Sequence, residues 1–193
     1  GAKTNREGGP SALAAAFVGK TPCYGLHLDA NRVPDVHVHV AAELKKLSDW
    51  GALGYCIGKK AENKIPYITG VKDADVDELK SFCASVVTYG AKPLFHMQGI
   101  TPGSEQYQPP KDKVTIDARD IEEAYGNIND ETVDIDFVCV GCPHCSIKEI
   151  AEIAQMLTGR KISPNAEFWV ATSRTAKQLA DTRGYTAVIE TAG

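Results

Sequence analysis

The chain contains 193 residues, of which 43% are hydrophobic, so it can bury one or two small cores. Its formal net charge of −4 offers no positive surface to a nucleic acid or an anionic membrane. No segment approaches the run of about 20 apolar residues that a transmembrane helix needs. Six cysteines without a secretory signal favour a cytoplasmic protein with reduced thiols over a disulfide framework.

In the first half of the chain, segments with helical periodicity alternate with short apolar segments typical of strands. Helices are predicted over residues 10–18, 41–56 and 75–89, and strands over residues 22–28, 36–40, 65–71 and 93–97. Residues 99–113 (GITPGSEQYQPPKDK) are rich in proline, glycine and polar side chains, which predicts a long loop or a domain boundary. Residues 1–98 are therefore expected to form an N-terminal α/β part.

Residues 114–193 continue the alternation and are expected to form a second α/β unit. Strands are predicted over residues 114–116, 133–140 and 167–171, and helices over residues 117–125, 146–158 and 173–183. Repeated strand–helix pairs predict an α/β fold with a mostly parallel sheet, whose functional sites lie at the carboxyl ends of strands.

The segment with the most reactive side chains is residues 141–146 (GCPHCS). It follows residues 133–140 (VDIDFVCV), which read as a buried strand, and it precedes a helix whose start carries a Ser146/Glu149 capping box. Cys142 and Cys145 are therefore predicted to lie in a turn at a helix N-terminus. The positive end of a helix stabilises the thiolate, which binds metals and attacks electrophiles.

Three interpretations of these cysteines remain open. Cys142 and Cys145 could form the dithiol of a thioredoxin-type oxidoreductase, although such a motif normally lies early in its fold rather than near the end. Cys139, Cys142 and Cys145 could form an iron–sulfur run, although Cys139 fits better as a small apolar residue packed in the strand. The third interpretation is a buried, inert pair of cysteines.

Further candidates lie at the start of the chain and among the histidines. Thr4, Asn5 and Arg6 precede a helix start and suit a carboxylate or phosphate, although position alone is also typical of a solvated chain end. His96 closes a predicted strand just before the long loop, which suits acid–base work or a hydrogen bond to substrate. His144 could steady the thiolate or orient a ligand.

His37 and His39 lie two residues apart on one face of a predicted strand, as in a two-histidine metal site. No carboxylate or thiol at useful spacing joins them. A solvent-facing pair on an edge strand is therefore predicted.

Several segments resemble one known family. Residues 136–146, followed by Glu149 and Ile150, resemble the Gly-Cys-Pro-His-x-Ser-x-x-Glu signature of the aconitase X family. Residues 1–9 (GAKTNREGG) are similar to that family's Gly-Ala-Arg-Thr-Asn-Arg-Glu-Gly motif. Residues 24–28, 31–34, 53–55 and 95–102 also match, in the family's order.

The resemblance implies a hydro-lyase in which an iron–sulfur cluster of the [4Fe-4S] type is held by three cysteines. One iron then stays open to act on a substrate hydroxyl. Cys142 matches one ligand, and the other two fall in segments outside this chain. His96 and His144 become the acid–base candidates, while Thr4, Asn5 and Arg6 become substrate contacts.

The resemblance also implies that the chain is an internal part of a large subunit, which is inactive by itself and needs a small subunit as its partner. Archaeal members of the family are implied to dehydrate mevalonate 5-phosphate in isoprenoid synthesis, and this is the favoured substrate. Bacterial relatives are implied to dehydrate cis-3-hydroxy-L-proline, which remains the alternative. No nucleic acid or membrane partner is expected.

Overall fold

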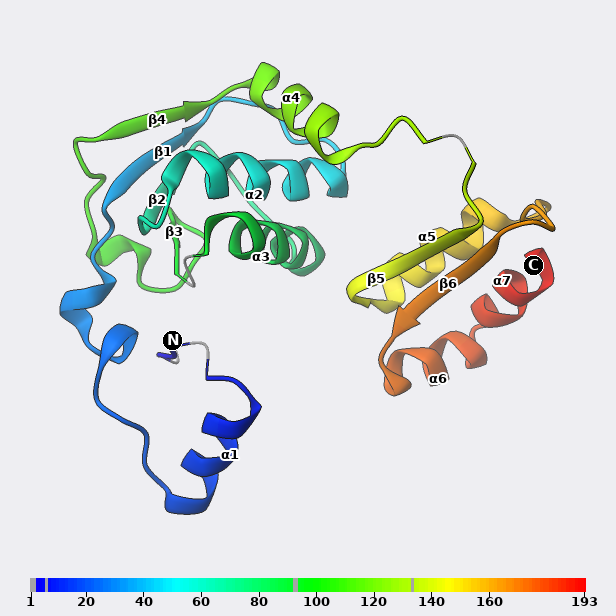
Figure 1. The fold of residues 1–193 in the computed structure, drawn as a ribbon, viewed down its shortest axis with the longest axis horizontal. Coiled ribbons are helices and arrows are strands. Elements are labelled where there is room, and N and C mark those ends of the chain that lie inside the picture. Colours follow the sequence, from blue (N-terminus) through cyan, green and yellow to red (C-terminus); the bar gives the residue numbers. More distant parts are fainter. Residues whose placement is uncertain (1–2, 6, 92–93, 133) are drawn as a thin grey trace. The chain divides into compact units, whose positions relative to one another are not determined.

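The sequence VHVHV forms strand β1 (Val36–Val40), and its alternation decides what each face of the sheet presents. In the computed structural model, which describes residues 3–5, 7–91, 94–132 and 134–193, the three valines are buried and the two histidines are half-buried. Successive side chains of a strand point to opposite faces of its sheet. The sheet around β1, which Figure 1 shows as a ribbon, therefore has one face with buried valines and one with half-buried histidines.

The chain divides into two units, residues 1–128 and 129–193. Within the described residues, the first unit holds a parallel sheet with the strand order β3-β2-β1-β4. Its elements in chain order are α1 (Gly9–Val18), η1 (Gly25–His27), η2 (Asp29–Arg32), β1, α2 (Leu47–Ala61), β2 (Pro66–Thr69), α3 (Val76–Gly90), β3 (His96–Met97), η3 (Ser104–Gln106), β4 (Lys113–Ile116) and α4 (Ala118–Ile128).

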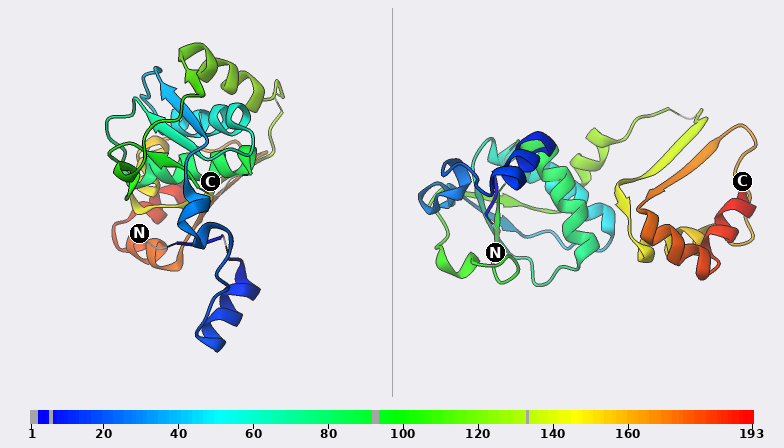
Figure 2. Two further views of the ribbon diagram at one scale, coloured as in Figure 1. Left: turned by 90° about the vertical axis from the view of Figure 1, so that its left-hand side faces the viewer. Right: turned by 90° about the horizontal axis from the view of Figure 1, so that it is seen from below.

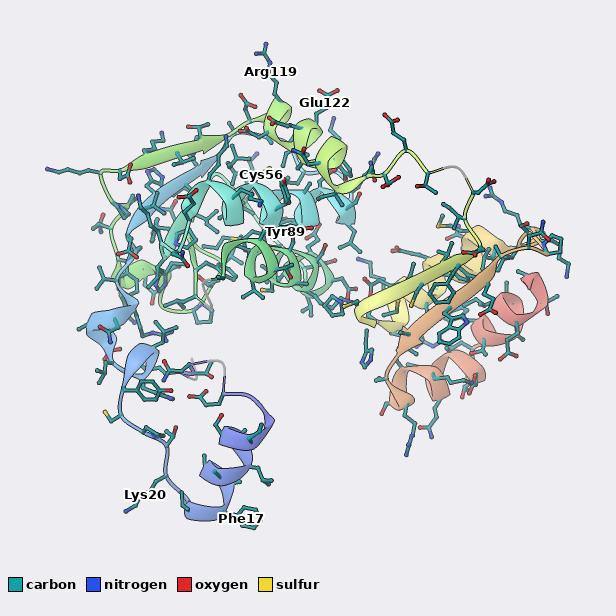
Figure 3. The ribbon with its side chains drawn as sticks, in the orientation of Figure 1. Phe17, Lys20, Cys56, Tyr89, Arg119 and Glu122 are labelled. Carbon is teal, nitrogen blue, oxygen red and sulfur yellow. The ribbon has the colours of Figure 1, made fainter. Side chains whose placement is uncertain are left out.

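Helices α2, α3 and α4 supply the core that covers the valine side of β1. The pair α2 and α3 lie side by side in all views (Figures 1 and 2). They approach closely because both carry glycine at the contact: a Cβ on Gly58 would lie 2.8 Å from the backbone nitrogen of Gly90. Arg119 and Glu122 point outward from α4, whereas Cys56 of α2 donates to the Asp120 carbonyl oxygen at 3.2 Å (Figure 3).

The polar face of the sheet carries a shared hydroxyl contact. Nε2 of His37 lies 2.8 Å and Nδ1 of His39 lies 3.2 Å from Oγ1 of Thr69 on β2. Burial, with Lys113 and His39 adding to it, lowers the pKa of His37. The prediction of an edge pair is wrong, because β1 lies between β2 and β4.

Residues 98–112 connect β3 to β4, which are the two opposite edges of the sheet. Tyr107 of this segment packs against His96, with ring centroids 4.3 Å apart. His96 is the register partner of Tyr67 on β2, and alternation places both side chains on the face opposite the buried Ile68 and Met97. The connection from β3 to β4 therefore packs against the sheet face that the helices leave open.

The second unit is built on two parallel strands, β5 (Phe137–Cys145) and β6 (Glu167–Thr172). Helices α5 (Ile147–Leu157), α6 (Arg174–Thr182) and α7 (Tyr185–Ala192) contact one another and lie together on one side of these strands (Figure 2). Their core is centred on Cys145, Ile150 and Ala180.

The α/β fold with a parallel sheet is confirmed, and several local predictions are corrected. Residues 22–28 form no strand but contain η1, because side chains from elsewhere hold that segment in a turn. The units separate after residue 128 rather than at 99–113, since β4 pairs with β1 and α4 packs on α2. Helix α7 was not predicted. No helix of the described residues has the length and hydrophobicity to cross a membrane.

Strand β5 also differs from its prediction as a buried strand. It runs on through the cysteine segment to Cys145. On the outer face of the two strands, Phe137 of β5 is 48% exposed and Trp169 of β6 is 59% exposed. The two rings meet edge to face with centroids 5.3 Å apart. Cys139 is exposed too, so its predicted role as a packed apolar residue is wrong for this chain.

Candidate functional site

Cys142 lies on an irregular part of β5. Val140 pairs with Val170 and Cys145 pairs with Thr172, so the register shifts in between. Gly141 starts this bulge with a φ of +114°, and a Cβ there would overlap the carbonyl oxygen of Ala171. Bulges re-aim side chains out of a regular ladder, and the Cys142 side chain is accordingly exposed.

The two cysteines of the motif are in different environments. Cys145 is buried at the end of β5, where its carbonyl oxygen accepts the Thr172 hydroxyl at 2.6 Å. Ser146 follows it and caps α5, with Glu149 completing the predicted capping box. All cysteines of the described residues are free thiols. Cys142 is thus the accessible thiol of the motif, and His144 beside it is also exposed.

The polar N-terminal segment folds onto the loop at residues 24–27. The Asn5 amide nitrogen donates to the Tyr24 carbonyl oxygen at 3.0 Å, and its oxygen accepts from the backbone nitrogen of Leu26. Thr4 donates its hydroxyl to the Glu7 carboxylate. Arg6 lies outside the described residues. The side chains of Thr4 and Asn5 therefore shape this loop, and their predicted contact with substrate stays a prediction.

Glu7 and His27 form a carboxylate–imidazole pair across this loop. Nε2 of His27 lies 2.6 Å from Oε1 of Glu7, and the imidazole is 15% exposed. The Thr4 hydroxyl first, then backbone N–H groups and His27, lower the pKa of Glu7 to about 2. A carboxylate accepts but does not donate, so Nε2 carries the hydrogen and Nδ1 remains the basic nitrogen of a neutral His27.

A chain of contacts continues from this loop to the sheet. Nη1 of Arg32 donates to the Leu26 carbonyl oxygen at 2.9 Å, and the Arg32 carbonyl oxygen in turn contacts Nε2 of His96 at 2.7 Å. His96 is buried, and burial lowers its pKa. The structure thus links Asn5 and His96 within the first unit, while Cys142 and His144 lie in the second. The acid–base roles of both histidines stay predictions.

Sequence reasoning missed Glu7 and His27 as a pair. Both residues fall inside segments that resemble the family's motifs, yet nothing in local spacing joins positions 20 residues apart. Alternating or helical periodicity reports which residues share a face of one element. It carries no information about a contact between two loops.

Comparisons with known proteins identify the family of the chain. Residues 34–126 match the family model described as aconitase X second domain, and residues 135–193 match the one described as aconitase X third domain. Over its full length the chain is 47% identical to the phosphomevalonate dehydratase large subunit of Methanothermobacter thermautotrophicus, of which it covers 48%. It is 28% identical to the cis-3-hydroxy-L-proline dehydratase of Pseudomonas aeruginosa, also over its full length, and covers 35% of that protein.

The crystal structure of Thermococcus kodakaraensis aconitase X in its holo form is also similar. It aligns over 100% of this chain and 50% of that one, with a TM-score of 0.88 and 40% identity. The chain therefore spans about half the length of the phosphomevalonate dehydratase large subunits it is most similar to among those named above, and about a third of the cis-3-hydroxy-L-proline dehydratase.

Proposed function

Because the chain belongs to the aconitase X family, we propose that it is part of the large subunit of a hydro-lyase that dehydrates mevalonate 5-phosphate. The observation that carries this choice of substrate is the difference in identity between two groups of relatives. Phosphomevalonate dehydratase large subunits are 32–47% identical to the chain, with four of them at 42% or more, whereas two cis-3-hydroxy-L-proline dehydratases are 28% identical. The proposal includes a small subunit as partner and a cytoplasmic location.

Cys142 suits one ligand position of an iron–sulfur cluster, because its thiol is exposed on a bulge whose backbone is fixed by Gly141. Across the described residues, no group of three or more His, Cys, Asp or Glu side chains could hold a metal ion. Further ligands of a [4Fe-4S] cluster would therefore come from other residues of the protein. When bound, such a cluster supplies a Lewis-acidic iron to a substrate hydroxyl.

Loss of water also requires that a proton leaves carbon and that the departing hydroxyl becomes water. His27 is a further candidate for moving one of these protons, since Glu7 fixes its ring through Nε2 and leaves Nδ1 available. Within the described residues Nδ1 has no hydrogen-bond partner. The same two-sided use of imidazole, with one nitrogen held by a carboxylate, recurs in acid–base catalysis.

The test uses the full-length large subunit with its small subunit, after anaerobic reconstitution with iron and sulfide. We expect Cys142→Ser to lower bound iron and acid-labile sulfide and to abolish dehydration of mevalonate 5-phosphate. Cys139→Ser is the matched control, because Cys139 is an exposed thiol on the same strand. It should retain both iron and turnover.

Three results would change the proposal. Activity on cis-3-hydroxy-L-proline alone would keep the reaction and replace the substrate. Normal iron content in Cys142→Ser would remove Cys142 from the ligand set. A reconstituted protein that binds no iron and dehydrates neither compound would favour the Cys142/Cys145 dithiol, which a reversible redox titration would then examine.

A further inference from the structure

Helix α1 exposes an unusually apolar surface. Its sequence GPSALAAAFV contains no charged residue, and its one polar side chain, Ser11, donates to the Gly8 carbonyl oxygen at 3.1 Å. The helix buries none of its residues, since Leu13 is 59% exposed, Phe17 82% and Val18 67%. The Phe17 ring points away from the other helices of the first unit (Figure 3). Among the described residues, α1 therefore has no apolar surface to pack against.

The apolar residues of α1 are not confined to one face. Successive residues of an α-helix are turned by about 100°, so Ala14 and Ala16, both exposed, lie on nearly opposite sides. A helix that is apolar on every side is normally buried in the core of a protein. A helix of ten residues is also marginal in water and depends on packing for its stability. The composition of α1 is therefore that of an interior helix.

The loop that carries α1 is closed at its base. The Asn5 side chain donates to the Tyr24 carbonyl oxygen at 3.0 Å, and the Glu7 carboxylate lies 2.6 Å from Nε2 of His27. These contacts join the two sides of the segment formed by residues 8–23. They hold the helix on a fixed base without using any of its apolar side chains. A preorganised element binds its partner with a smaller loss of entropy.

The length and charge of α1 argue against a membrane as its partner. Its ten residues are about half the number that a membrane-spanning helix needs. Helices that lie on a membrane surface combine one apolar face with a basic, polar face. Because α1 has no charged residue and no polar face, a protein interior is the environment that fits it.

The family's domain order indicates which protein supplies that interior. The models that match the chain describe the second and third domains of aconitase X, and the earlier match begins at residue 34. Helix α1 lies ahead of that point. The chain also covers only 48% of the similar large subunit from Methanothermobacter thermautotrophicus. The large subunit of the proposed function therefore has additional polypeptide, including a first domain, that can enclose the helix.

We infer that α1 inserts into the first domain of the same large subunit, whose apolar side chains enclose it on all sides. This inference rests on the part of the proposed function that makes the chain a portion of that subunit. The small subunit, or a second copy of the large subunit, would meet α1 across one surface and leave its opposite side exposed. Enclosure on all sides thus distinguishes the first domain from both.

The experiment measures thiol labelling of the full-length large subunit, first alone and then with its small subunit. Ala14→Cys and Ala16→Cys place a small thiol on opposite sides of α1, and N-ethylmaleimide is the probe, with peptide mass spectrometry to follow each site. In the large subunit alone, both sites should react at least about 100-fold more slowly than in concentrated urea, because an enclosed thiol reacts only when the structure opens. Glu122→Cys is the control, since Glu122 points outward from α4 (Figure 3), and it should be slowed less than about tenfold.

Phe17→Ala gives a second measurement that needs no introduced thiol. If the Phe17 ring is enclosed, its removal leaves a cavity and should lower the melting temperature of the large subunit by about 5 °C or more. Lys20→Ala is the matched control, because Lys20 is an exposed, charged residue just beyond the helix (Figure 3). It should leave the melting temperature unchanged.

Four results would overturn the inference. The first is rapid labelling of both sites in the large subunit alone, whether or not the small subunit then protects them. The second is protection at only one of the two sites, which would show docking on one face. The third is protection that grows with protein concentration, which would show a second copy. The fourth is an unchanged melting temperature in Phe17→Ala.

Turnover of mevalonate 5-phosphate and cis-3-hydroxy-L-proline, measured on the same preparations, separates this inference from the proposed function. Protection of both sites in a protein that dehydrates neither compound would support the inference and overturn the proposed function. Rapid labelling in a protein that dehydrates mevalonate 5-phosphate would do the opposite.

Discussion

Asn5 shows how a polar residue of a motif can position another side chain through the backbone of a loop. Both polar atoms of its side chain are bonded to the backbone of residues 24–26, which precede His27. The orientation of His27 relative to Glu7 therefore depends on Asn5. A substitution at Asn5 would displace the imidazole even where the Glu7 carboxylate is unchanged.

The Glu7–His27 pair gives a prediction about acid stability. The pKa of Glu7 is lowered from 4.5 to about 2 in the folded protein, so folding favours its carboxylate. The contribution of Glu7 to the free energy of unfolding is fully present above pH 4.5 and is lost as the pH falls toward about 2. Glu7→Gln should thus lower the melting temperature near neutral pH, and the difference from the wild type should shrink on acidification.

Thermal unfolding of both proteins across that pH range measures the effect. Glu122→Gln is the control, because Glu122 points outward from α4 (Figure 3) and should leave the profile unchanged. A difference between Glu7→Gln and the wild type that stays constant down to the lowest pH would contradict the assigned shift.

The residues of the site were predictable only where their signal is local. Cys142 could be found because a strand, a cysteine motif and a capping box follow one another in the sequence. The contact between Glu7 and His27 could not, because the two residues lie in separate loops. No spacing rule reports such a contact between two loops.

At the scale of elements, the contact between α2 and α3 depends on glycine. Alanine normally favours a helix over glycine by about 1 kcal/mol. At Gly58, however, an added Cβ would press against the backbone of α3 at 2.8 Å, and neither backbone can yield without moving its helix. Gly58→Ala is therefore expected to destabilise the protein by about 1–3 kcal/mol.

Gly126→Ala is the matched comparison, since Gly126 lies in α4 and a Cβ added there would meet nothing within 4 Å. It should be neutral or should stabilise by up to about 1 kcal/mol. Urea unfolding of the two variants and the wild type measures both changes in the free energy of unfolding. Equal effects at the two positions would show that helix propensity, rather than the close approach, decides the outcome.

The starts of α3, α5 and α6 were predicted well because their causes lie within four residues, whereas α2 begins at Leu47 and not at residue 41 as predicted. Asp75, Ser146 and Ser173 each cap the helix that the sequence places after them. The strand predicted over residues 22–28 failed because Asn5, Asn31 and Arg32 hydrogen-bond its carbonyl groups instead of a neighbouring strand. Pairing partners of this kind are tertiary, so local propensity cannot reveal them.

At the scale of the whole chain, each unit has its own core, and the two cores differ in size. The first is built from large buried side chains such as Phe82, Leu53 and Ile57. The second is centred on Cys145, Ile150 and Ala180. A domain of about 60 residues buries a smaller share of its surface and is marginally stable. We expect the second unit to unfold at a lower urea concentration than the first.

Hydrogen exchange followed by mass spectrometry at increasing urea tests this expectation. Amides of β5 and α5 should lose protection before those of β1 and α2. Simultaneous loss in all four elements would mean that the two units unfold together.

The predicted boundary at residues 99–113 would have assigned β4 to the second unit. Composition marks a long loop but does not report that β4 returns to pair with β1.

The hydroxyl of Thr69 has a single hydrogen, yet two imidazole rings lie within bonding distance of its oxygen. When one of the two ring nitrogens accepts that hydrogen, the other must donate its own. Because the two contacts use different ring nitrogens, His37 and His39 then share one tautomer, either Nδ1–H or Nε2–H, and a change of tautomer in one ring requires a change in the other. The position of the ring hydrogen in one histidine is thus coupled to its position in the other through the Thr69 hydroxyl.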